Sequence, residues 1–138
     1  MEPITQEHLT THVPKLTLNH IKRGVSGYVE FALENPLKDR IICVDYARKK
    51  IKFKNKDGDI IVDPEMSKLA PMFFESIKDK STELVYGNQD IENIDSDMLE
   101  SVAKLFSTNT DVRQASRGIK SEFYHDFVKQ VCCASLID

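Results

Sequence analysis

The segment from Lys50 to Lys54, KIKFK, restricts the fold of this chain more than any other part of the sequence. Side chains alternate between the two faces of a strand, so a strand here places Ile51 and Phe53 on one face and all three lysines on the other. The pattern predicts that the two apolar side chains are buried and that the three lysines are exposed. A sheet with one buried face and one wet face is typical of antiparallel pairing.

Turn and strand signals on both sides extend this strand into a sheet. Lys56-Asp57-Gly58 predicts a turn, because glycine readily adopts the positive φ that tight hairpins need. Arg40–Asp45 is apolar and β-branched enough for a buried strand, and Asp59–Val62 can return as a short one. The sequence therefore predicts an antiparallel hairpin or a three-stranded meander over residues 40–62.

The N-terminal part predicts a lead-in followed by a helix. Residues 1–16 contain two prolines and are predicted to be irregular or loosely helical. Thr17 can cap a helix that runs to about Glu34, because apolar residues recur at helical spacing. Gly24 and Gly27 either weaken this helix or permit close packing on another element.

The middle of the chain predicts a long helix. Asp63 is a candidate N-cap, since proline occupies the next position, and Gly87 is a candidate C-terminal cap. Pro71 lies within this run and predicts either a kink or the start of a second helix.

Two further helices are predicted near the C-terminus. Asp97 has a glutamate three residues later, which is the spacing of a capping box. The stretch from Asn109 to Gly118 predicts a loop, and Ser121 can cap a last helix that extends to Leu136. We therefore expect a single α+β domain over residues 17–138, in which a small antiparallel hairpin or meander packs against three to five helices.

Composition narrows the class of protein. No apolar run approaches the roughly 18 residues that span a bilayer, so a membrane partner is not expected. Met1 is not followed by a basic and apolar leader, and we expect no secretory signal. Three cysteines, of which Cys132 and Cys133 are adjacent, indicate reduced thiols in a cytoplasmic setting.

Enzyme signatures are weak. Cys43 could act as a nucleophile with His20 or His125 as its base, but no local motif supports such a pair. The cysteines and histidines lack zinc-site spacing, and no glycine-rich phosphate loop follows a strand. We therefore expect no catalytic residues, no metal and no cofactor.

Charge is distributed unevenly along the chain. Residues 40–56 carry seven basic residues against Asp45 alone, whereas residues 57–100 carry twelve acidic residues against three lysines. Acidic helices lying over the basic hairpin, or simple solvation, would explain this distribution. A surface for a partner would explain it too.

Two sets of residues are candidates for contact with a partner. A basic β-ribbon could follow the phosphates of a nucleic acid. The long helix carries more apolar surface than one helix face needs, which predicts a protein interface. The first set is Arg48, Lys49, Lys50, Lys52, Lys54 and Lys56, and the second is Met66, Met72, Phe73 and Phe74.

The hairpin region also follows the spaced motif C-x-D-x-x-R-x-x-x-x-F/Y-K-x-x-x-G. Its members here are Cys43, Asp45, Arg48, Phe53, Lys54 and Gly58, followed by the DPEM stretch from Asp63 to Met66. With this motif, residues 16–86 and 121–135 resemble the C-terminal domain of a group of uncharacterised giant-virus proteins, from nucleocytoplasmic large DNA viruses. The resemblance implies a viral protein in the cytoplasm of an infected host cell, with the virion as a second location. It implies no particular activity.

We therefore expect a non-enzymatic protein-interaction or assembly domain of a viral protein, which self-associates or binds another viral protein. The alternative is a weak, sequence-nonspecific nucleic-acid-binding module that uses the basic β-ribbon.

Overall fold

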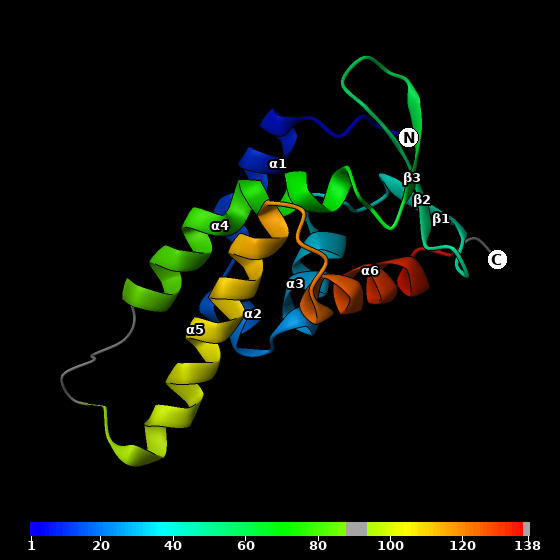
Figure 1. The fold of residues 1–138 in the computed structure, drawn as a ribbon. Helices are drawn as coiled ribbons and strands as arrows, with labels where there is room; N and C mark the ends of the chain where they lie inside the picture. Colours follow the sequence, from blue (N-terminus) through cyan, green and yellow to red (C-terminus); the bar gives the residue numbers. More distant parts are fainter. Residues whose placement is uncertain (88–93, 137–138) are drawn as a thin grey trace.

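The computed structural model describes residues 1–87 and 94–136, and it has the α+β architecture that the sequence predicts (Figure 1). Within this part of the chain, one three-stranded antiparallel sheet accompanies six α-helices and a short 3-10 helix, η1. In chain order the elements are α1 Gln6–His12, η1 Val13–Lys15, α2 Leu18–Lys22, α3 Val25–Glu34, β1 Ile41–Asp45, β2 Lys50–Lys54, β3 Ile60–Pro64, α4 Leu69–Gly87, α5 Ser96–Ser116 and α6 Glu122–Ala134.

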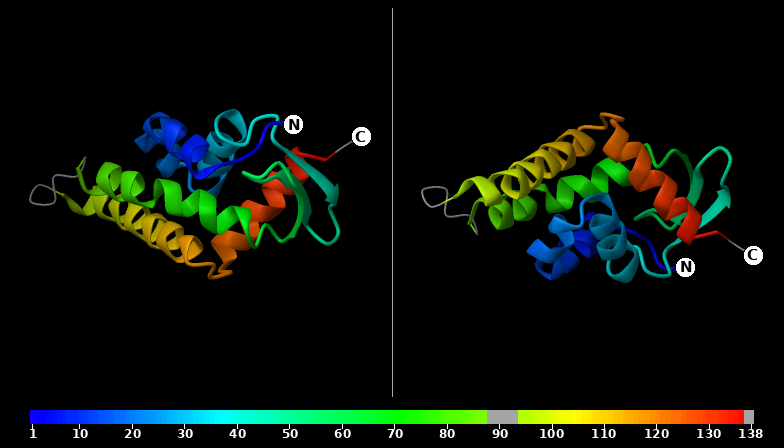
Figure 2. Two further views of the ribbon diagram at one scale, coloured as in Figure 1. Left: turned by 90° about the horizontal axis from the view of Figure 1, so that it is seen from above. Right: turned by 90° about the horizontal axis from the view of Figure 1, so that it is seen from below.

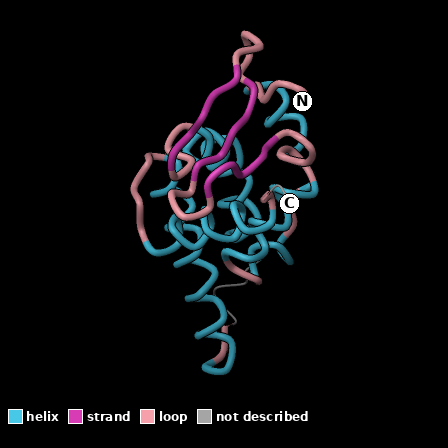
Figure 3. Tube along the Cα trace, turned by 90° about the vertical axis from the view of Figure 1, so that its right-hand side faces the viewer, coloured by secondary structure: helices cyan, strands magenta, loops and turns pink. Residues whose placement is uncertain are grey.

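The sheet confirms the predicted meander. Its strand order is β1-β2-β3, and Ile51 and Phe53 of the central strand are buried. Gly58 has the positive φ expected in the turn between β2 and β3, and the side-chain oxygen of Asn55 accepts a hydrogen bond from the Asp57 amide at 3.0 Å. Figure 3, in which the sheet is nearest the viewer, shows the helices behind the strands. The inner face of the sheet therefore closes one end of a helical core.

The lead-in is partly helical, over α1 and η1, and it belongs to the core, whereas the sequence predicted a segment outside the domain. Ile4, Leu9 and Leu16 are all buried. The Ile4 amide also donates a hydrogen bond to the Lys54 carbonyl oxygen at 2.8 Å, which ties the N-terminus to the sheet. The domain boundary predicted at residue 17 is therefore wrong, because these apolar side chains pack with the remainder of the fold.

The helix predicted from Thr17 to Glu34 is divided in two. Thr17 caps α2, as predicted, because its side chain accepts a hydrogen bond from the His20 amide. Gly24, with φ of 65°, then turns the chain between α2 and α3. A Cβ atom at Gly27 would overlap the backbone of His20, so glycine permits α3 to pack closely on α2. This break and the helical lead-in raise the helix count above the predicted three to five.

Asp63 caps α4 from a distance. The prediction that a helix begins beside Asp63 is wrong, because Asp63 and Pro64 continue strand β3. The chain then turns through two residues with φ of 57° and 53°, and α4 begins at Leu69. The buried Asp63 carboxylate accepts hydrogen bonds from the amides of Lys68 at 3.0 Å and Leu69 at 2.8 Å. Pro71 falls in the first turn, where a helix needs no amide donor.

Helix α5 is longer than predicted. Its N-cap is Asp95, not Asp97, and the predicted loop Asn109–Gly118 is helical except for its last two residues. Asn109 is buried, and its side-chain oxygen accepts a hydrogen bond from the Ser81 hydroxyl of α4 at 3.0 Å. A polar residue that suggests a loop in the sequence therefore joins two packed helices.

The last helix begins as predicted and ends earlier. The Ser121 hydroxyl accepts a hydrogen bond from the Tyr124 amide. Helix α6 stops at Ala134, and Leu136 lies beside Cys43 as a parallel bridge to β1. The edge of β1 is therefore partly covered by the end of the chain.

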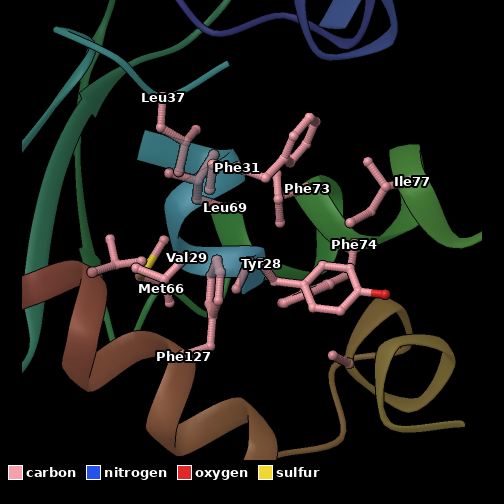
Figure 4. Close-up of a cluster of buried hydrophobic side chains, with 14 of the residues drawn as sticks. Tyr28, Val29, Phe31, Leu37, Met66, Leu69, Phe73, Phe74, Ile77 and Phe127 are labelled. Atoms are coloured by element: carbon pink, nitrogen blue, oxygen red, sulfur yellow. The ribbon is translucent and has the colours of Figure 1, made fainter. Parts of the chain in front are cut away.

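Aromatic side chains from three helices meet in the core (Figure 4). Phe73 and Phe127 are stacked with ring centroids 5.5 Å apart, and Phe74 contacts Phe127 edge to face at 4.7 Å. The Tyr28 hydroxyl lies 2.7 Å from the Ser81 hydroxyl, so its polar atom is satisfied inside the core. α3, α4 and α6 are thereby held together behind the sheet.

Candidate functional site

The outward side of the sheet combines basic and aliphatic side chains. On the central strand, Lys52 is paired with Ile42 of β1 and with Val62 of β3, and Lys54 is paired with Ile60. We call this surface the outer face; it comprises Ile42, Val44, Lys50, Lys52, Lys54, Ile60 and Val62.

The lysine row is less exposed than predicted. Lys50, Lys52 and Lys54 are each half-buried. Lys52 lies between Ile42 and Val62, Lys54 lies beside Ile60, and Lys50 lies opposite Asp45 of β1 and Pro64 of β3. In the part of the chain that the structure describes, no carboxylate lies within 4.0 Å of any of these three ammonium groups. The idea that acidic helices neutralise the hairpin within one molecule therefore does not hold for this row.

The aliphatic part of the outer face is open to solvent. Val44 is 44% exposed, Ile60 is 48% exposed and Val62 is 49% exposed. The sequence did not identify these residues, because β1 and β3 are apolar on both faces and show no alternation. The sequence signal was only the β-branched composition of both strands.

The remaining candidate cations lie at the ends of the ribbon. Arg48 is in the turn between β1 and β2, where its guanidinium is 3.9 Å from the Asp45 carboxylate. The Lys49 ammonium lies 3.7 Å from the ring centroid of Tyr46 and donates a hydrogen bond to the Tyr46 carbonyl. Lys56 is exposed in the opposite turn. The fold thus places all six predicted cations on one ribbon, with three of them in a row.

The predicted apolar interface is mostly core. Met66, in the turn before α4, and Phe73 and Phe74 of α4 are fully buried, because side chains of α3 and α6 converge on them. Met72 alone is half-buried, and it lines a groove of about 410 Å³ together with Phe53. The prediction that these four residues form a protein interface is therefore wrong for Met66, Phe73 and Phe74, because a partner cannot reach them.

Histidine and cysteine side chains do not assemble into a reactive pair among the described residues. Cys43 and Cys132 are buried, and burial together with the neighbouring Cys43 raises the pKa of the Cys132 thiol. The His20 ring contacts Thr17 and Phe31, and its pKa is lowered by burial and by Arg23. No cluster of His, Cys, Asp or Glu suited to a metal ion occurs in residues 1–87 and 94–136.

No protein-family model, curated protein or solved structure matches this chain. None of the described helices is both long and apolar enough to cross a bilayer. The outer face of the sheet is therefore the feature from which a function can be argued.

Proposed function

We propose that the outer face is a protein-docking surface and that this chain is a non-enzymatic interaction or assembly domain. One observation carries the proposal. Half-exposed aliphatic side chains lie beside lysines whose ammonium groups have no carboxylate within 4.0 Å in the described part of the chain. Apolar contact area supplies affinity, and the charged row selects an acidic partner.

The resemblance to giant-virus proteins supports a viral context for this role. In that context the domain acts in the cytoplasm of the infected host cell or in the virion. Its partner is a second copy of the chain or another viral protein whose surface offers carboxylates beside apolar side chains.

Weak nucleic-acid binding is the second candidate, and the unpaired lysine row favours it. Side chains two positions apart on a strand are about 6.6–6.8 Å apart, so three ammonium groups could meet successive phosphates. The aliphatic neighbours oppose this reading, because they offer nothing to a phosphate backbone. Tyr46, the nearby aromatic side chain, already lies under Lys49, so it is a poor platform for a base.

Affinity capture with matched variants tests the proposal. The bait is the whole chain, used as wild type, as Ile60→Ser/Val62→Ser, as Lys50→Gln/Lys52→Gln/Lys54→Gln, and as Ile119→Ser. Ile119 is 45% exposed in the loop before α6, so it matches the first variant in chemistry but lies off the outer face. Each capture from the cells that produce the chain is run with and without nuclease.

The docking proposal predicts nuclease-resistant capture of polypeptides by the wild type and by Ile119→Ser, with loss in both outer-face variants. Nuclease-sensitive capture that is lost only in the lysine variant would instead support nucleic-acid binding. Equal capture by all four baits would show that the outer face is not the docking surface.

A further inference from the structure

The far end of the α4–α5 hairpin is the charge complement of the outer face. We call it the hairpin tip and define it as residues 83–87 and 94–100. Tyr86, Met98 and Leu99 are 54%, 49% and 59% exposed there. From Ser81 to Ala103, every charged side chain that the structure describes is acidic: Glu83, Asp95, Asp97 and Glu100.

The acids of the tip are only partly engaged within the chain. Glu83 lies 3.8 Å from Lys80, and Asp95 caps α5 through the Met98 amide. Asp97 and Glu100 have no basic group within 4.0 Å among the described residues. The tip therefore presents free carboxylates beside exposed apolar side chains, whereas the outer face presents free ammonium groups beside exposed apolar side chains.

These two surfaces cannot meet within one molecule. Figures 1 and 2 show the tip and the sheet at opposite ends of the fold. The α4–α5 hairpin points away from the strands, and its two helices pack along each other. Any contact between the tip and the outer face therefore joins two copies.

We infer that the occupant of the outer face is the hairpin tip of a second copy, so that copies join head to tail. This inference rests on the proposed docking role of the outer face. A two-fold contact of face with face would place one lysine row against another, and tip with tip would place acids against acids; both arrangements are disfavoured by like charge. A head-to-tail contact uses two different patches, so it leaves one of each free and builds rings or open filaments.

Complementary charge reversal tests this arrangement in the purified chain. One variant is Lys50→Glu/Lys52→Glu/Lys54→Glu on the outer face, and the other is Asp97→Lys/Glu100→Lys on the tip. Neither set removes a hydrogen bond that the structure shows. Glu122→Lys/Asp126→Lys on α6 is the matched control, since it reverses two exposed acids at the start of another helix. Sedimentation velocity over a concentration series measures association.

We expect the wild type and the α6 control to associate with equal affinity. The outer-face variant and the tip variant should each have a dissociation constant at least about tenfold higher. An equimolar mixture of the two variants should restore association, because the intact tip of one meets the intact face of the other. Misfolding of a variant cannot produce this restoration.

The inference is overturned if the wild type stays monomeric at its highest soluble concentration, if the tip variant associates like the wild type, or if mixing restores nothing. A monomeric wild type that still captures another protein through the outer face would overturn the second-copy assignment and leave the docking role intact. Loss of face-dependent capture as well would remove both.

Discussion

The two halves of α4 lie in different surroundings. From Leu69 to Ile77 the helix is enclosed by α3, α6 and the sheet, and Phe73 and Phe74 have no exposed surface (Figure 4). From Lys78 to Gly87 it has fewer buried apolar side chains: Ser81 bonds to Tyr28 of α3 and Asn109 of α5, Val85 is buried, and the last large side chain, Tyr86, is 54% exposed.

This difference assigns the stability of the fold to one half of α4 and contact with a partner to the other. The first half holds the aromatic core together, so changes there act on folding. The second half, with the start of α5, contributes less buried apolar area and leaves side chains free for a partner. Variants in the first half of α4 and variants at the hairpin tip should therefore give opposite results in folding and association measurements.

The largest expected effect separates Phe73 from Leu99. Phe73→Ala should lower the free energy of unfolding by about 3–5 kcal/mol, because it empties a fully enclosed site between aromatic rings. Leu99→Ala at the tip should change it by less than about 0.5 kcal/mol. Urea denaturation of both variants measures the difference, and comparable losses would show that the tip is part of the core.

Glycine positions provide a second contrast. Gly27→Ala should cost about 1–3 kcal/mol, because the new methyl group meets the His20 backbone and must push α2 away from α3. Gly87→Ala, where no atom of the described residues lies within 4 Å of the added methyl group, should be neutral or stabilising by about 0.4–1 kcal/mol. Thermal unfolding of both variants measures this. An unaffected Gly27→Ala would contradict the close packing of α2 on α3.

Alkaline pH should weaken the packed end. Burial raises the pKa of Tyr28 and of Tyr124 above the value of about 10 that tyrosine has in an unfolded chain. Below a pH of about 10 both tyrosines are protonated in the folded and in the unfolded chain, so their contribution to the free energy of unfolding is complete. Above it the unfolded chain loses protons that the folded chain retains, so stability falls as pH rises toward the folded pKa.

Each tyrosine should add a slope of up to about 1.4 kcal/mol per pH unit in this window. The slope is measured by denaturing the wild type and Tyr28→Phe at pH values from about 9 to about 12. A slope that Tyr28→Phe leaves unchanged would mean that the Tyr28 hydroxyl is not held in the core.

Only a small effect on stability is expected at the outer face. Lys50→Gln/Lys52→Gln/Lys54→Gln should change the free energy of unfolding by less than about 0.5 kcal/mol per site, because no ion pair is removed.

Any affinity for duplex DNA should be weak and sequence-blind, with a log–log salt slope of about −0.9 per phosphate engaged. Fluorescence titration at two salt concentrations measures this. Binding that survives the triple change would place a nucleic-acid site elsewhere.

Local patterns in the sequence were sufficient for part of this fold. The alternation around Ile51 and Phe53 predicted which face of β2 is buried, because strand geometry fixes that choice residue by residue. Thr17 and Ser121 were identified as caps because a cap depends on amides only three residues away.

Only the tertiary structure decided the remainder. Strands β1 and β3 are apolar on both faces, so their pattern could not show that Ile60 and Val62 point outward beside the lysines. Met66, Phe73 and Phe74 were predicted at a surface, and the convergence of α3 and α6 buries them. The physical reason is range: alternation and capping act between near neighbours, whereas burial of an apolar side chain depends on which distant elements come to cover it.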